Sequence, residues 1–539
     1  MRSFLRFFES KIFPAYLLLL VFFIPLYPKL PLLDVSFTWT YVRLEDFLVA
    51  LAYLAFFVIV LVRRPRLQEI PLFWWVVGFW GVGLVSTLVA IPFLENGDGY
   101  VTYKPHLVVI NYLRRIEYMG LFVVYAYVFR DWLKIKKFLI CLIAALVLVV
   151  MYGFGQIFLG FCSFLTMNEE FAKGNCLPLQ VGGRVSSTFG GHYDLAGYLV
   201  LLLPMIFALA FAQEERRFNL LMIGILISGF VLMLFTSSRI SFAALLVSLA
   251  FIGFMQVKRK KILIWGMLSL LAITLILGRN TIVERFSDTI RIRQVTVDPQ
   301  NNNQILPLPT TQKDWAGLPE SDSAILIPFT PVESTNSAYR VYKYEKSEYE
   351  KLREMYPNMD ITTIEVPNAE IKENDTQVKR EIIEEKRLVE GNFERRWALV
   401  FDISFTTRVQ GGWPIAWSAF LHNPITGKGY STVTAAVDSS YFRALGEVGI
   451  LGFVSFFGIL IVFLMKAMSA VKIYGLRTIE GTMLLGVCGG VIGLLINALL
   501  IDIFEASKVA FVLWMVLGVS VVLIQNVKKD AKYDVVKKI

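Results

Sequence analysis

Residues 137–160 read KFLICLIAALVLVVMYGFGQIFLG, and no charged side chain follows Lys137 in this stretch. A helix needs about 20 apolar residues to cross the hydrocarbon core of a bilayer. The stretch is apolar on every face instead of alternating, so it predicts a transmembrane helix and not a strand of a membrane barrel. This run alone therefore indicates a membrane protein.

The rest of the chain repeats this signal. Of its 539 residues, 56% are hydrophobic and only 18% are charged, whereas about a quarter are charged in an average soluble chain. The predicted fold is an all-α polytopic membrane protein. The first apolar run lacks a small-x-small cleavage site, so we expect it to remain as a span. We predict about twelve transmembrane helices, at residues 11–28, 45–62, 71–93, 107–129, 137–160, 193–212, 218–236, 240–256, 261–278, 441–465, 481–503 and 507–527.

Lys and Arg residues predict the orientation of these helices. Basic residues accumulate in cytoplasmic loops, and here they gather in the segments between alternate spans. Both termini are therefore predicted to be cytoplasmic, and residues 279–440 extracytoplasmic. The net charge of +10 follows mostly from this topology, so binding of nucleic acid is not expected. The basic residues on the predicted inner side include Arg63, Arg64, Arg66, Arg130, Lys134, Lys136, Lys258, Arg259, Lys260, Lys528, Lys529, Lys532, Lys537 and Lys538.

The polar stretch 279–440 divides the chain into three parts. Residues 1–278 are expected to hold transmembrane helices 1–9. Residues 279–440 form a large extracytoplasmic loop domain with an interfacial segment. Residues 441–539 hold helices 10–12 and a basic cytoplasmic tail.

The loop domain is expected to be small and of mixed α/β structure. Strand-like runs occur at residues 324–327 and 362–366. Residues 369–405 instead predict a helix with one apolar stripe, which would either pack on the rest of the loop or lie on the membrane. Residues 413–424 are too short to span and predict an interfacial helix, followed by a glycine turn at 425–429. The stripe consists of Val378, Ile382, Val389 and Phe393.

Cysteine and histidine are scarce. Cys162 and Cys176 lie in or beside the predicted outward loop 161–192, where they either form a disulfide or remain two free thiols. The three histidines are far apart, and the chain has no CxxC motif. Neither a metal site nor a cofactor is therefore expected.

Ionisable residues inside predicted spans are costly and tend to mark function. Arg114, Arg115 and Glu117 lie in the fourth span. Arg114 and Glu117 share a helix face because they are three residues apart. We regard all three as candidate substrate-binding residues. The alternative is an internal ion pair that holds helices together.

Three polar segments lie at the predicted outer surface. The turn Thr236-Ser237-Ser238-Arg239 combines hydroxyl groups, a guanidinium and the start of a helix, which together suit an anion. Arg408 lies shortly before the chain re-enters the membrane and is a second cation of the same kind. Asp438 precedes the tenth span, where an acid either caps the helix or takes part in chemistry.

In this order, the motifs resemble those of the O-antigen ligase/polymerase superfamily of bacterial envelope enzymes. The resemblance covers about residues 185–278 and 395–525, and the ordered set is more specific than any one motif. It rests on Ser187-Thr188-Phe189-Gly190-Gly191-His192-Tyr193-Asp194-Leu195-Ala196-Gly197-Tyr198 with Pro204, on Thr236 to Arg239, on Arg408 with Trp413 or Trp417, Asn423-Pro424 and Gly427-x-Gly429, and on Asp438 to Gly452.

The resemblance implies glycan transfer at the outer face of the cytoplasmic (inner) membrane. The donor would be a saccharide on undecaprenyl diphosphate, and the acceptor a saccharide, a lipid or a protein. Arg239 and Arg408 would neutralise the leaving diphosphate through forked hydrogen bonds. Membrane lipids would be further partners, and neither a nucleotide sugar nor a metal would be needed.

Ligases of this family carry His and Asn where this chain has Asp438 and Ser439, and polymerase-like members more often carry an acid. We therefore favour a polymerase, with Asp438 as the candidate base that takes the proton from the acceptor hydroxyl. Glu447, further along the same span, would assist it. His192 and Ser238 are further candidate substrate-binding residues.

Two other functions are open on the sequence. The charges of the fourth span would suit a transporter or flippase of a polyprenol-linked or other anionic substrate, although the two halves of the chain show no evident repeat. The third interpretation is a non-catalytic envelope protein whose outward domain binds partners.

Overall fold

The structure of the protein is a computed structural model. It separates into two compact units, one formed by Met1–Val283 with Gly411–Ile539 and the other by Glu284–Gln410. We call them the helical unit and the strand unit. The residues that it describes are 6–34, 41–91, 105–166, 169–179, 183–212, 215–256, 290–300, 304–305, 324–326, 333–345, 382–401, 407–433 and 437–536.

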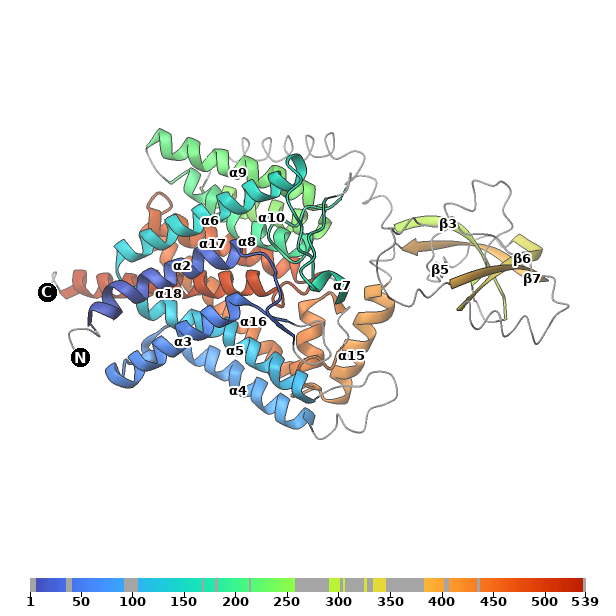
Figure 1. Cartoon of the computed structure of the whole chain (residues 1–539), viewed down its shortest axis with the longest axis horizontal. Coiled ribbons are helices and arrows are strands. Elements are labelled where there is room, and N and C mark those ends of the chain that lie inside the picture. The colour runs from blue at the N-terminus through green and yellow to red at the C-terminus, as the bar shows by residue number, and fades with distance from the viewer. Residues whose placement is uncertain are drawn as a thin grey trace. The chain divides into compact units, whose positions relative to one another are not determined.

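Long helices make up the helical unit (Figure 1). A π-helical turn, Phe8–Ile12, leads directly into the first of them. In Figure 1, α2 begins and α18 ends at the same end of this unit. We call the opposite end, at which α8, α10 and α16 begin, the site end. The helices are α2 (Phe13–Leu26), α3 (Leu44–Arg63), α4 (Phe73–Ala90), α5 (Pro105–Val128), α6 (Trp132–Phe158), α7 (Glu169–Ala172), α8 (His192–Ala210), α9 (Arg216–Thr236), α10 (Arg239–Gln256), α15 (Trp413–His422), α16 (Ser440–Tyr474), α17 (Ile479–Asn497) and α18 (Ser507–Val536).

The prediction of a polytopic membrane protein is confirmed. Within the described residues, ten helices are long and apolar enough to cross a membrane. The predicted span 107–129 is the helix α5, which is 24 residues long but is not among the ten. Its three charged residues, Arg114, Arg115 and Glu117, lie close together near its middle. The predicted span 261–278 lies outside the described residues.

The helices α8 and α17 pack closely because α17 presents glycine to α8. A Cβ atom at Gly486 would lie 2.4 Å from the Met205 Cα, and one at Gly490 would lie 2.3 Å from the Leu201 carbonyl oxygen. Small residues four apart let helix backbones approach each other in a membrane. Of the residues in the α8 and α18 spans, 83% and 94% are buried, so these two helices form the centre of the unit.

The strand unit contains an antiparallel sheet built around one long strand. The strand β7 (Ile382–Phe401) pairs with β3 (Ile290–Val297), with β5 (Ala324–Leu326) and with β6 (Glu333–Glu345). The short strand β4 (Gln304–Ile305) extends the sheet beyond β3. The register is set by pairs such as Ile290 with Phe401 and Glu345 with Ile382.

The predicted strand at 324–327 is confirmed by β5, whereas the predicted helix at 369–405 is wrong over its described part. Residues 382–401 form β7, and the predicted strand at 362–366 lies outside the described residues. Val389 and Phe393 are four residues apart, a spacing that places side chains on one face of a helix and equally on one face of a strand. Pairing with Ala338 and Thr335 of β6, which is distant in sequence, decides for the strand.

Candidate functional site

The helix α16 is broken close to its start. Gly449 has a φ of 64° and a ψ of −168° inside the helix. The break frees backbone groups, which must find partners because a membrane interior offers no water. The predicted glycine turn after α15 supplies them, through the hydrogen bonds from Lys428 N–H to Gly446 O (2.9 Å), from Gly429 N–H to Glu447 O (2.8 Å) and from Ile450 N–H to Pro424 O (2.8 Å).

A buried ionic cluster lies beside this break. Arg443 donates to the Glu447 carboxylate at 3.0 Å and to the Asp502 carboxylate at 2.7 Å. The backbone N–H of Ser431 donates to the same Glu447 oxygen at 3.0 Å. Glu447 therefore joins the glycine turn to α16, and its carboxylate is occupied by these partners.

A second arginine faces the same region from α5. Arg115 pairs with Glu505, and its guanidinium lies 5.4 Å from the centre of the Tyr430 ring. Burial raises the pKa of the Tyr430 hydroxyl above its usual value, so this group stays protonated. Arg115, Arg443 and Glu447 line a cavity of about 40 Å³. Such a volume holds a few water molecules but not a sugar ring. The charged residues that line this cavity therefore do not bind a saccharide inside it.

Arg114 points to a different set of partners from its neighbour. Its guanidinium lies 3.4 Å from the Asp46 carboxylate of α3 and 3.9 Å from the Glu117 carboxylate. It also donates to the Tyr41 carbonyl at 3.4 Å. The internal ion pair that the sequence left open is therefore present, with Asp46 as the nearer partner.

Residues 497–508 comprise the last residue of α17, the segment between the two helices and the start of α18. We call them the connection, and they join the predicted motifs at the site end. Asn497 accepts a hydrogen bond from Ser241 of α10 at 3.0 Å. The carbonyl of the next residue, Ala498, accepts the N–H of Ser440 at 3.0 Å. Ser241 lies two residues after Arg239, and Ser440 lies two residues after Asp438. The Arg239 turn and the Asp438 segment therefore meet on the successive residues Asn497 and Ala498.

The same connection is tied to α2 by a buried lysine. Lys508 donates to the carbonyls of Pro25 (3.1 Å), Tyr27 (2.6 Å) and Thr188 (2.7 Å). Three acceptors satisfy all the protons of an ammonium group. Nearby, Lys29 pairs with Glu45 at 3.1 Å, and burial lowers the pKa of Lys29 to about 8. Lys29 therefore remains largely charged at neutral pH.

The predicted anion-binding turn has a defined hydrogen-bond chain. Ser238 donates to the Ser241 hydroxyl at 2.7 Å, and Ser241 in turn donates to Asn497. Ser238 is buried, whereas the side chain of Arg239 is partly exposed. This hydrogen-bond chain fixes the start of α10, whose first residue is Arg239.

Left-handed backbone conformations gather at the site end. Six non-glycine residues in the described part have positive φ, and four of them are Ser187, Ser237, Ser431 and Asp438. Such conformations cost energy and concentrate at functional sites. Three of these four, Ser187, Ser237 and Asp438, lie within the motifs on which the resemblance rests. This distribution supports a functional site there.

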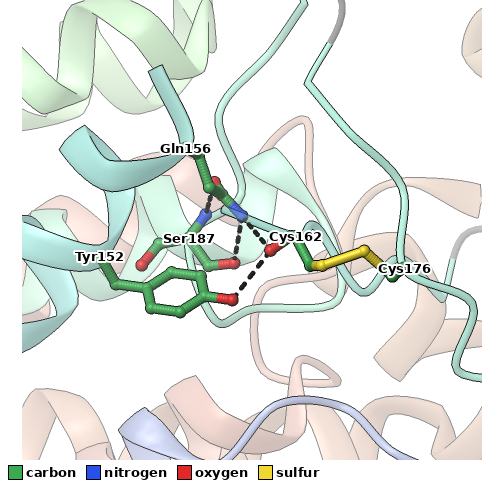
Figure 2. The surroundings of a disulfide bond; sticks show 5 residues. All are labelled: Tyr152, Gln156, Cys162, Cys176 and Ser187. Carbon is green, nitrogen blue, oxygen red and sulfur yellow. Dashed lines mark hydrogen bonds between the residues drawn. A yellow bond between two sulfur atoms is a disulfide. The ribbon is translucent and has the colours of Figure 1, made fainter. Parts of the chain in front are cut away.

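A disulfide joins Cys162 and Cys176, so the first of the two alternatives left by the sequence is present (Figure 2). Figure 2 shows Gln156 of α6 at the centre of this region. Its side chain donates to the carbonyls of Cys162 and Ser187, both at 2.9 Å, and accepts the Ser187 N–H at 2.8 Å. The disulfide loop and the segment leading into α8 are thereby anchored to one residue.

We expect the Cys162→Ser/Cys176→Ser variant to lose about 3 kcal/mol of unfolding free energy, because the unfolded chain is no longer cross-linked. The measurement is denaturation in mixed micelles with and without reductant. The wild type should lose the same amount on reduction, and the variant should not respond to it. Equal stability of the oxidised and reduced wild type would contradict this expectation.

The two remaining predicted residues are His192 and Arg408. His192, the first residue of α8, is buried, and its ring nitrogen lies 3.0 Å from the Arg184 guanidinium. Arg408 belongs to the strand unit, in the helical turn Thr407–Gly412, and its side chain is buried.

Five residues of this region were not among the predicted site residues: Arg443, Asn497, Asp502, Glu505 and Lys508. One signal was present, because Asp502 falls inside the predicted span 481–503, and a carboxylate there is costly. In the structure α17 ends at Asn497, so Asp502 belongs to the connection.

No protein-family model matches the chain, and no curated protein matches it either.

Proposed function

We propose that the protein transfers a glycan from an undecaprenyl-diphosphate-linked donor to an acceptor at the outer face of the cytoplasmic membrane. A saccharide acceptor, and hence a polymerase, is the preferred form. The observation that carries the proposal is the meeting of the Arg239 turn and the Asp438 segment on Asn497 and Ala498. This arrangement brings a cation and a carboxylate from distant parts of the sequence to one region of the site end.

The two groups suit the two halves of a glycosyl transfer. Asp438 takes the proton of the acceptor hydroxyl, whose oxygen attacks the anomeric carbon of the donor sugar. The bond between that carbon and the diphosphate oxygen breaks, and the diphosphate leaves with the bonding electrons. Arg239 stabilises the negative charge that develops on it. Asp438 is half-buried and Arg239 partly exposed, so both are accessible to a membrane-bound donor.

The ionic cluster holds the reacting segment in place. Glu447 binds Ser431 and Arg443, and Arg443 binds Asp502 of the connection. The Glu447 carboxylate therefore acts as a positioning group for the start of α16. Asp438, two residues before α16, depends on that position.

The disulfide supports the outward orientation of the site end. Disulfides persist in oxidising compartments and are rare in the cytosol. Cys162 and Cys176 lie between α6 and α8, that is, at the end where α8 begins. An outward site end would also place the termini of the helical bundle in the cytoplasm, as the basic residues predict.

Arg239→Ala is expected to lower glycan transfer about 100-fold, the usual effect of removing one charge-stabilising group. The measurement uses purified protein in liposomes with undecaprenyl-diphosphate oligosaccharides, followed by gel and mass spectrometry. Arg216→Ala, an exposed arginine at the other end of α9, is the matched control and should keep full activity. Asp438→Asn should also abolish the ladder of longer glycans. Full activity of both site variants would refute the proposal.

The broken helix favours transport as a second candidate. Discontinuous membrane helices line the substrate sites of many transporters, and α16 is interrupted at Gly449. Here the glycine turn fills the break. The same liposomes discriminate the two functions, since a transporter would move the donor across the bilayer without changing its mass.

A further inference from the structure

An open cleft lies at the end of the helical unit opposite the site end. Its volume is about 480 Å³. One wall consists of residues 68–75, that is, the end of the connection from α3 to α4 and the first turn of α4. The other consists of Lys466 of α16 with Ile524 and Gln525 of α18. A volume of this size accommodates a small organic ligand or a lipid headgroup.

The cleft combines one cation with an aromatic wall. In the part of the chain that the structure describes, the Lys466 ammonium forms neither a hydrogen bond nor an ion pair. The carboxylate that also lines the cleft, Glu69, is paired with Arg66 at 3.5 Å. Trp74 is 65% exposed and Trp75 is 39% exposed. The cleft therefore has an ammonium group without an ion-pair partner among the described residues, beside two indole rings.

The backbone holds this aromatic wall in an unusual conformation. Leu72 has a φ of 70°, in the left-handed region that a branched side chain rarely adopts. Its carbonyl accepts the N–H groups of Trp75 and Val76 at 3.0 and 3.1 Å. Trp75 in turn packs against Gly458 of α16, where a Cβ atom would lie 2.4 Å from the ring. Trp75 is thus held against α16 by packing.

We propose that this cleft binds one anionic phospholipid. Its phosphodiester lies on Lys466, and an acyl chain runs along Trp74. Tryptophan and lysine at the end of membrane helices match the boundary between headgroups and hydrocarbon. A free phosphate would use the ammonium but not the indole rings, so the aromatic wall favours the lipid. The site is separate from the proposed catalytic region and does not depend on it.

The test is native mass spectrometry of the full chain with phosphatidylglycerol or phosphatidylcholine. Lys466→Ala is expected to weaken retention of phosphatidylglycerol about fivefold, because one basic residue contributes about 1 kcal/mol toward an anionic lipid. Lys472→Ala is the matched control, since Lys472 is exposed on the same helix and does not line the cleft. It should bind as the wild type does. Trp74→Ala should weaken the retention of both phosphatidylglycerol and phosphatidylcholine.

Two outcomes would overturn the assignment. Equal retention of phosphatidylglycerol by Lys466→Ala and the wild type would show that Lys466 does not bind the phosphodiester. Release of the lipid by millimolar inorganic phosphate would assign the cleft to a soluble anion. Melting curves of all variants establish that each is folded, so a loss of lipid is read as a loss of binding.

Discussion

Gly449→Ala is expected to prevent the protein from reaching its native packing. A residue with φ of 64° and ψ of −168° is in a region that is essentially restricted to glycine. The added Cβ atom would also lie 2.4 Å from the Ile425 carbonyl oxygen and 2.6 Å from the Gly427 nitrogen. Both are backbone atoms of the glycine turn, so they cannot rotate away. The combined cost exceeds about 4 kcal/mol, which is exceptional for one substitution.

The measurement is the yield of monodisperse protein in detergent, followed by unfolding in mixed micelles. Gly78→Ala is the matched control, because Gly78 lies inside α4 and a Cβ atom there meets nothing within 4 Å. Alanine is the better helix former, so this variant should be as stable as the wild type or slightly more so. A Gly449→Ala protein with wild-type yield and stability would show that the break in α16 is not required.

Arg443→Ala is expected to lower the free energy of unfolding by about 3–5 kcal/mol. Removing one partner of a buried ion pair leaves an uncompensated charge, which costs this much. Here two carboxylates are left, because Arg443 binds both Glu447 and Asp502. The side chain exposures of Arg443 and Glu447 are 12% and 4%, so water compensates little of the loss.

A variant without charges in the cluster separates two effects of Arg443→Ala, namely the unpaired charge of the two carboxylates and the lost packing of the Arg443 side chain. Arg443→Met/Glu447→Gln/Asp502→Asn should recover most of the stability, because neutral side chains do not carry the desolvation cost of a buried charge. Arg66→Ala serves as a surface control, because Arg66 is 79% exposed in its pair with Glu69, and such pairs contribute little. If Arg443→Ala unfolded like the wild type, the cluster would have no role in holding α16 to the connection.

The membrane helices were predictable because their signal is local. Residues 137–160 need no partner to be recognised, and α6 contains nearly all of them. The strand β7 was not predictable from its own sequence, since Val389 and Phe393 fit both periodicities and the pairing with β6 decides between them. Local patterns therefore predict elements that are stable in lipid, but not those that depend on distant strands.

The candidate site shows the same limit. Arg239 and Asp438 could be singled out as charges at the ends of predicted spans. That both segments meet at Asn497 and Ala498 depends on the packing of α10, α16 and α17. The role of Glu447 was likewise hidden, because Ser431 and Arg443 occupy its carboxylate only in the folded chain.

The burial of α18 has a consequence for biosynthesis. Translation proceeds from the N-terminus, so α18 leaves the ribosome after every other described helix, although 94% of the residues in its span are buried. Lys508 then supplies the bonds to Pro25, Tyr27 and Thr188. Before α18 inserts, the helices that pack around it lack this central partner. Assembly of the candidate site therefore waits for the insertion of α18, and a nascent chain that stops before α18 lacks these contacts.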